Sequence, residues 1–185
     1  MANANSEQQS IDYAKLQLAL EQAVSKDGDR YAAIVNVPFS FTVAMAYLFL
    51  GIIMLVFVNE KRQAVQATAV AQTDFADNID AMANIPAEAI FIPLTADTNL
   101  IIKAIKSGKP QASKDWSDLM RPVVPDEQAR FLQASGGISF TAVHPLEDSK
   151  GAIVYSFFRR ETMDIPAQED FMTHYTQQVS NFLQS

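Results

Sequence analysis

One uncharged stretch constrains the possible folds of this chain more than any other feature. It covers residues 31–59, and its most apolar part, residues 38–58, reads PFSFTVAMAYLFLGIIMLVFV. About 20 apolar residues in a helix cross a hydrocarbon layer of roughly 30 Å. Lipid offers no partners for backbone N–H and C=O groups, so a segment that enters it must be helical. The stretch therefore predicts one transmembrane helix over residues 31–59.

Single residues at both ends fit such an anchor. Pro38 suits the first helical turn, where its missing N–H has no partner to lose. Lys61 and Arg62 follow the apolar part and can extend their charged groups to lipid headgroups. A small residue such as Gly51 would let a neighbouring helix approach. A buried helix of a soluble domain is the alternative, although such helices rarely lack charge over this length. The anchor residues that we predict are Pro38, Tyr47, Gly51, Val58, Lys61 and Arg62.

The segments on either side of the anchor have helical patterns. Residues 1–30 form a polar arm, in which residues 10–26 place apolar and charged side chains at helical spacing. This predicts a short amphipathic helix, which either lies on the membrane or a partner or remains a solvated arm. Residues 60–83 are rich in alanine, with small or apolar residues three and four apart, and predict a stalk helix. Weak dimerisation through this seam and packing on the following domain both fit the pattern.

The composition excludes several kinds of site. The net charge of −7 and the pI near 4.7 argue against nucleic-acid binding, which needs a clustered basic surface. The absence of cysteine from the sequence removes thiol nucleophiles, disulfides and cysteine-ligated metals. The two histidines, His144 and His174, have no further ligands at metal spacing, and no phosphate-binding or hydrolase motif is present. We therefore expect no metal, no cofactor and no catalytic residues.

Residues 84–185 predict one domain of helices and strands. Gly108 ends the first helix of this domain, and Pro125 opens the second. The last helix carries Phe171, Tyr175 and Phe182 on one stripe and must therefore pack on the rest of the domain. The strands that we expect cover residues 89–94, 138–146 and 152–160, the last two as a hairpin.

Short motifs in this domain occur in a characteristic order. They are IPL at 92–94, SGKP at 107–110, VHPL at 143–146 and GAI at 151–153. In this order they resemble the second half of a GAF domain, and the resemblance covers residues 62–185. It implies an α+β fold in which an antiparallel sheet is flanked by helices. The predicted chain is thus one transmembrane helix, a stalk helix and a GAF-like domain.

The resemblance also implies a gap at the front of the sheet. GAF sheets have two strands between their first helix and the IPL motif, whereas only residues 84–89 are available here. At most one strand fits, so we expect an open sheet edge that a partner protein, a second copy or the arm covers. GAF relatives that reduce methionine sulfoxide or attach bilins do so through cysteine, which this chain lacks.

Trp116, Asp115 and Asp118 are the weak candidates for a ligand site. They lie together in a turn-rich segment, where a ring and two carboxylates could line a pocket. The alternative is structural, because a lone Trp is most often a packing anchor and an Asp often caps a helix. Both interpretations stay open, as does the existence of a small-molecule ligand.

Two functions fit these features best. The first is a non-catalytic, membrane-anchored, GAF-like regulatory or binding module that acts through a partner protein. The second is a structural accessory subunit of a larger membrane complex. The partners that we expect for the protein are the lipid bilayer and either other membrane-complex subunits or a homodimer partner. An enzyme is the third and least favoured class. Positive residues are balanced across the anchor, so only the analogy with GAF domains places the domain in the cytoplasm.

Overall fold

Six strands form one antiparallel sheet, which is the centre of the molecule. The computed structural model describes residues 11–83, 89–147, 150–158 and 165–185. The strands are β1 (Leu50–Asn59), β2 (Ala64–Val70), β3 (Phe91–Pro93), β4 (Gln111–Ser113), β5 (Ile138–Pro145) and β6 (Gly151–Phe158). Their spatial order is β3-β2-β1-β6-β5-β4, with β1 and β6 in the middle.

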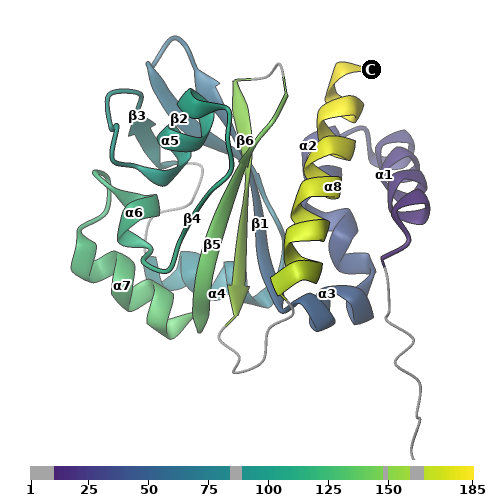
Figure 1. Ribbon diagram of the computed structural model, residues 1–185, viewed down its shortest axis with the longest axis horizontal. Helices are drawn as coiled ribbons and strands as arrows, with labels where there is room; N and C mark the ends of the chain where they lie inside the picture. Colours follow the sequence, from purple (N-terminus) through teal and green to yellow (C-terminus); the bar gives the residue numbers. More distant parts are fainter. Residues whose placement is uncertain (1–10, 84–88, 148–149, 159–164) are drawn as a thin grey trace, which may run out of the picture.

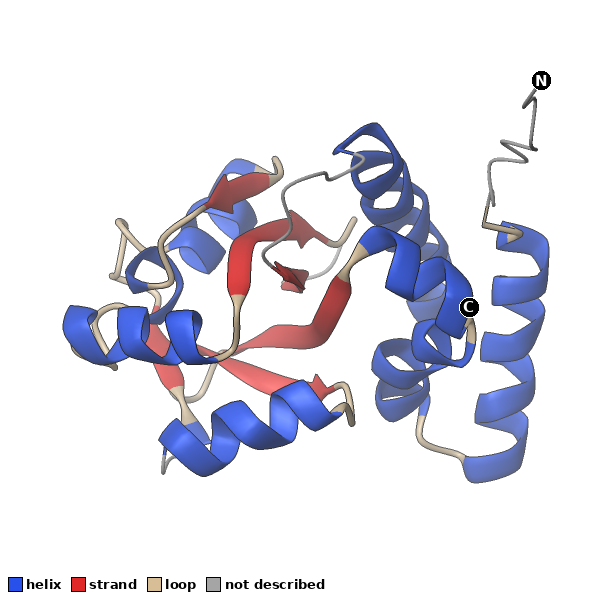
Figure 2. Cartoon of the chain, turned by 90° about the horizontal axis from the view of Figure 1, so that it is seen from below, coloured by secondary structure: helices blue, strands red, loops and turns tan. Residues whose placement is uncertain are grey.

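Helices cover both faces of this sheet (Figure 1), and a view from below shows the strands between the two helical groups (Figure 2). One face carries α1 (Tyr13–Asp27), α2 (Arg30–Asn36), the 3-10 helix η1 (Val37–Ser40), α3 (Thr42–Leu48) and α8 (Ile165–Gln184). The other face carries α4 (Asp74–Ala83), α5 (Leu100–Ser107), α6 (Ser117–Met120) and α7 (Asp126–Ser135). The architecture is therefore α+β in three layers, with a hydrophobic cluster on each side of the sheet.

The predicted transmembrane helix over residues 31–59 is wrong. Pro38 lies in η1 and Tyr47 in α3, whereas Gly51 and Val58 belong to β1. Among the described residues, no single helix is long and apolar enough to span a membrane. Arg30–Ser40 and Thr42–Leu48 meet that criterion only as a pair, which is bent by 82°.

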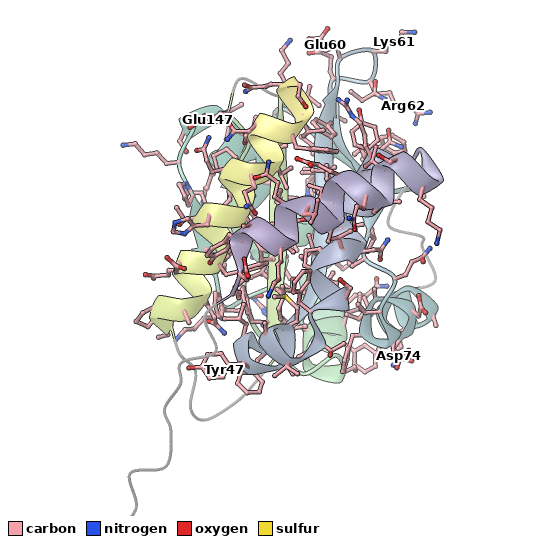
Figure 3. All side chains as sticks on the ribbon, turned by 90° about the vertical axis from the view of Figure 1, so that its right-hand side faces the viewer. Tyr47, Glu60, Lys61, Arg62, Asp74 and Glu147 are labelled. Atoms are coloured by element: carbon pink, nitrogen blue, oxygen red, sulfur yellow. The ribbon has the colours of Figure 1, made fainter. Side chains whose placement is uncertain are left out.

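The predicted anchor residues are also spread over the molecule. Figure 3 shows Tyr47 at one end of it and Lys61 and Arg62 at the other. Lys61 and Arg62 lie in the turn between β1 and β2. The guanidinium of Arg62 lies 4.1 Å from the ring centroid of Phe91 on β3, where a cation–π contact holds it.

The position of β1 explains why this stretch has no charge. Ile53 and Leu55 contribute to the cluster under α1, α2 and α8, and Ile52 and Val56 contribute to the cluster under α4–α7. Alternate side chains of a strand point to opposite faces, and both faces of this sheet are covered by helices. A central strand in such a sheet needs apolar residues at every position, and it then resembles a membrane segment in sequence.

The predicted stalk helix over residues 60–83 is also wrong. This segment contains a turn, the strand β2 and the separate helix α4. Alanine is compatible with both secondary structures, and the pairing of β2 with β1 and β3 decides the outcome. β1 and β2 are the two leading strands that the predicted sheet lacked. The front of the sheet is therefore filled by these two strands, and the short strand β3 is the edge on that side.

Two glycines allow aromatic rings to lie flat on the central strands. A Cβ atom at Gly51 would overlap the ring of Phe158, and a Cβ atom at Gly151 would lie 2.5 Å from a ring carbon of Phe57. Both positions therefore require glycine for the close approach of a side chain. Gly51 thus has a role in the sheet and not, as predicted, in a membrane helix.

The helices at the two ends of the described chain pack against each other, and α8 also packs on β5 of the sheet. The helix predicted in the arm corresponds to α1, and its Leu16 and Leu20 are completely buried. Phe171 and Tyr175 of α8 are buried as the stripe predicts, whereas Phe182 is only half-buried. Tyr13 of α1 donates a hydrogen bond to Asp170 of α8, with 2.8 Å between the oxygens. The helical part of the arm, Tyr13–Asp27, is therefore part of the folded domain.

Candidate functional site

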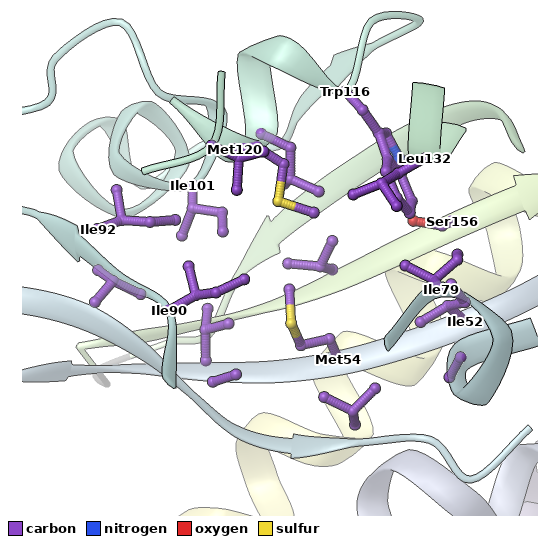
Figure 4. A pocket seen from close by; sticks show the side chains of 18 of the residues that line it. Ile52, Met54, Ile79, Ile90, Ile92, Ile101, Trp116, Met120, Leu132 and Ser156 are labelled. Atoms are coloured by element: carbon purple, nitrogen blue, oxygen red, sulfur yellow. The ribbon is translucent and has the colours of Figure 1, made fainter. Parts of the chain in front are cut away.

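A cavity of about 90 Å³ lies between the sheet and the layer of α4–α7 (Figure 4). Ile52, Met54 and Val154 line it from the strands, and Ile101 and Leu132 line it from the helices. Met54 and Met120 reach it from opposite sides (Figure 4). Methionine side chains are flexible and polarisable, so they adapt to ligands of different shape. The wall is therefore mainly apolar and adjustable.

A chain of three hydrogen-bonded side chains lies at the cavity, and two of them, Trp116 and Ser156, line it. Trp116 donates its indole N–H to the hydroxyl oxygen of Thr141, with 2.8 Å between the two atoms. The hydroxyl oxygens of Thr141 and Ser156 are also 2.8 Å apart, so one of these hydroxyls donates to the other. The second hydroxyl proton has no acceptor among the residues that the structure describes. Since Ser156 and Trp116 line the cavity, a hydrogen bond from this chain to a ligand is available there.

Gln128 is a second polar group at the cavity. It is half-buried on α7, and its amide makes no hydrogen bond within the described part of the chain. An amide side chain both donates and accepts hydrogen bonds. Few, well-separated polar groups in an apolar wall are typical of sites that bind small molecules.

The three residues that the sequence suggested for a ligand site have different positions in the structure. Trp116 lies in the cavity wall, but Asp115 and Asp118 do not line it. Asp115 accepts from the backbone N–H of Ser117 and pairs with Arg130, 2.9 Å away. Burial alone would raise the pKa of Asp115, but the hydrogen bonds from Arg130 and Ser117 lower it to about 2. Asp118 accepts a hydrogen bond from Ser113 at 2.6 Å. The two carboxylates therefore fix the turn that carries Trp116.

Most of the residues that line the cavity were not predicted as site residues from the sequence. Ile52 and Met54 were assigned to a membrane helix, and Ala67 and Ile79 to a stalk, so none of them could be placed in a pocket. Ser156 carried a usable signal, because it is the single small polar residue in the strand sequence GAIVYSFF. A small polar residue in a strand that is otherwise apolar marks a buried hydrogen bond.

The histidines lie apart from this cavity. His144 is on β5 and faces the α8 layer, and His174 is on α8, where it stacks on Tyr13 with 4.8 Å between the ring centroids. Within the described ranges, no group of three or more His, Cys, Asp or Glu side chains is arranged to hold a metal ion.

The sequence by itself identifies no relatives. No protein-family model matches it, and no curated protein matches it. Solved structures do match the fold. The GAF domain of Acinetobacter phosphoenolpyruvate-protein phosphotransferase has a TM-score of 0.57 at 9% identity, over 100% of this chain and 95% of that chain. The phycocyanobilin-bound GAF domain of a cyanobacterial phytochrome has a TM-score of 0.56 at 13% identity, over 94% of each chain.

An enzyme shares this fold as well. The reduced form of fRMsr from Staphylococcus aureus has a TM-score of 0.53 at 10% identity, over 95% of this chain and 97% of that chain. The same protein has been solved as a complex with its substrate. GAF domains and this enzyme thus share one fold. This chain therefore has a GAF-like fold.

Proposed function

We propose that this chain is a non-catalytic, GAF-like sensing module that binds a small, mostly apolar molecule and acts through a partner protein. The cavity between the sheet and α4–α7 supports this proposal most directly. Its wall is apolar except for Gln128 and the hydroxyl chain that ends at Ser156. These groups suit a molecule with an apolar body and one hydrogen-bond acceptor.

The size of the cavity restricts the ligand. Sites for drug-sized ligands measure about 300–1,000 Å³, whereas this cavity measures about 90 Å³. The ligand we propose is therefore a compact molecule such as a small ketone, and is much smaller than a bilin. The absence of cysteine from the sequence supports a binding role over thiol-dependent catalysis. A structural accessory subunit is not favoured, because it relied on the predicted membrane helix.

Nuclear magnetic resonance of Trp116 tests the proposal. Trp116 is the single tryptophan of the sequence, so the ¹⁵N–¹H spectrum contains one indole signal. The probes are cyclopentanone and cyclopentane, which share their shape and differ in the carbonyl acceptor. We expect both to shift the indole signal saturably, with cyclopentanone binding about tenfold more tightly, as one hydrogen bond of about 1.4 kcal/mol provides.

Two serine variants distinguish the contribution of the hydrogen bond to cyclopentanone binding from that of the apolar wall. Ser156→Ala should reduce the preference for cyclopentanone to less than about twofold, because it removes the hydroxyl chain from the wall. Ser180→Ala is the control, since Ser180 is equally buried but lies on α8, on the opposite face of the sheet. It should leave the preference unchanged. The proposal fails if neither probe shifts the signal, or if Ser156→Ala retains the tenfold preference.

A further inference from the structure

A second hollow of about 340 Å³ lies on the other face of the sheet. It is formed by the edge strand β4, by β5 and by the first half of α8. Its size falls within the range of about 300–1,000 Å³ that is typical of small-molecule sites. The residues used below are Phe140, Ala142, His144, Glu169 and Met172. We call this hollow the β5–α8 groove.

His144 is the unusual residue of the groove. Its side chain is only 8% exposed, and the edge of its ring meets the ring of Tyr155 with 5.7 Å between centroids. Neither ring nitrogen forms a hydrogen bond to any residue in the described ranges. Although the residue is mostly buried, its ring nitrogens are not sealed from solvent, so a polar group of a ligand can reach them from the hollow. The imidazole therefore offers a hydrogen-bonding position to a ligand there.

The protonation state of His144 defines what it can bind. Burial lowers the pKa of His144 to about 4, so the ring is neutral at pH 7. A neutral imidazole has one nitrogen that donates and one that accepts a hydrogen bond. An N–H group of a ligand can therefore bind to the accepting nitrogen.

The charge around the groove favours a cation. Glu169 on α8 is the one charged side chain among the described residues that line the groove. The chain as a whole has a net charge of −7. An anionic ligand would meet a carboxylate and find no basic partner, whereas an ammonium group finds two acceptors, at His144 and Glu169.

The apolar part of the groove fits a hydrocarbon group. Phe140 and Ala142 project from β5, and Met172 faces them from α8. The ring of Phe140 stacks on Phe157, with 4.7 Å between centroids and 8° between planes, so it is held in place. A fixed aromatic face beside a flexible methionine provides a surface for a ring or an alkyl chain.

We propose that the β5–α8 groove is a binding site for a small amphipathic amine. The ammonium group lies between His144 and Glu169, and the apolar group lies on Phe140, Ala142 and Met172. This site is separate from the cavity under α4–α7, because the sheet lies between them. Its test therefore succeeds or fails independently of the proposed sensing function.

The histidine signals of the folded chain provide the test. The sequence contains two histidines, so the proton spectrum shows two ring Cε1–H signals, and His174 outside the groove serves as the internal reference. The probes are 2-phenylethylamine and 3-phenylpropionate, which share a phenyl group and carry opposite charges at pH 7. We expect 2-phenylethylamine to shift the His144 signal saturably and by more than the His174 signal. 3-Phenylpropionate should leave both signals in place.

Variants of the groove sharpen this result. Glu169→Gln should weaken 2-phenylethylamine binding about tenfold, since it removes the charge but keeps the shape. Glu127→Gln on α7 removes an equally exposed charge outside the groove and should not change the affinity. His144→Phe should abolish binding; Glu169→Gln decides the matter if that variant does not fold. The proposal is overturned if 2-phenylethylamine gives no saturable shift, if 3-phenylpropionate binds equally well, or if Glu169→Gln behaves like Glu127→Gln.

Discussion

Trp116 donates its indole N–H to Thr141 across 2.8 Å, and both side chains are almost completely buried. The bond joins the segment that precedes α6 to β5 in the sheet. The Thr141 hydroxyl also shares a hydrogen bond with the hydroxyl of Ser156 on the neighbouring strand β6, in which either group can donate. Trp116, Thr141 and Ser156 thus form one connected chain beside the cavity.

The first prediction concerns this bond. Trp116→Phe removes the donor, leaves space beside the ring and should lower the free energy of unfolding by about 2–4 kcal/mol, measured by urea denaturation. The contribution of the hydrogen bond is isolated in the Thr141→Val background, because valine has no oxygen to accept the indole N–H. There Trp116→Phe should cost about 1 kcal/mol less. An equal cost in both backgrounds would mean that the bond contributes nothing.

A second prediction tests whether α1 belongs to the folded domain. Leu20 is 1% exposed and Leu18 is 53% exposed, although they lie on the same helix. Leu20→Ala should destabilise the chain by about 2–5 kcal/mol, because it leaves a cavity in the core. Leu18→Ala is the matched control and should change stability by less than about 0.5 kcal/mol. Similar small losses for both variants in thermal unfolding would show that α1 is a detached arm.

The third prediction concerns the central strand. Gly51→Ala places a methyl group where the ring of Phe158 lies, so we expect a loss of at least about 2 kcal/mol. Replacing the ring should relieve this overlap. In the Phe158→Ala background, Gly51→Ala should cost less than about 1 kcal/mol. If the cost stays the same in both backgrounds, the strand and the ring are not in contact as described.

The fourth prediction concerns pH. Burial lowers the pKa of His144 to about 4 from an ordinary value of 6.5, so between these values the unfolded chain binds a proton here and the folded chain does not. The free energy of unfolding should therefore fall as the pH decreases from about 6.5 to about 4, by up to about 3 kcal/mol. Above pH 7 this contribution should be constant.

His144→Phe supplies the reference for that measurement. Tyr155 and Glu169, the titratable groups that share its surroundings, are present in both proteins. The unfolding free energy of the wild type should therefore decrease more steeply than that of the variant between pH 7 and pH 4. Parallel curves over this range would contradict a buried, neutral His144.

The second half of the fold was predictable because its signals are local. The IPL motif, Gly108 and the hairpin after residue 138 all correspond to elements of the structure. Gly108 has a φ of 63°, which favours glycine at the end of α5. The cap of that helix is Asn99, whose side chain accepts from the backbone N–H groups of Ile101 and Ile102.

The first half was not predictable from local pattern. β1 is apolar on both faces because helices on both sides cover it, and this depends on contacts with β6, about a hundred residues further along. A window of sequence cannot distinguish such a strand from a membrane helix by hydrophobicity. Because β1 was interpreted as a membrane helix and β2 as part of a stalk, the cavity that both strands line could not be predicted. Trp116 was therefore predicted as a site residue, but the strands that it faces were not.

The most direct test of the central claim is the dissociation constant of cyclopentanone in a variant whose cavity is filled. Ala67 lies on β2, lines the cavity and is 7% exposed. Ala67→Leu should fill that space and abolish the saturable shift of the Trp116 indole signal. Ala46→Leu, an exposed position on α3, is the control and should leave the affinity unchanged. An Ala67→Leu variant that binds cyclopentanone as tightly as the wild type would show that the cavity is not the ligand site.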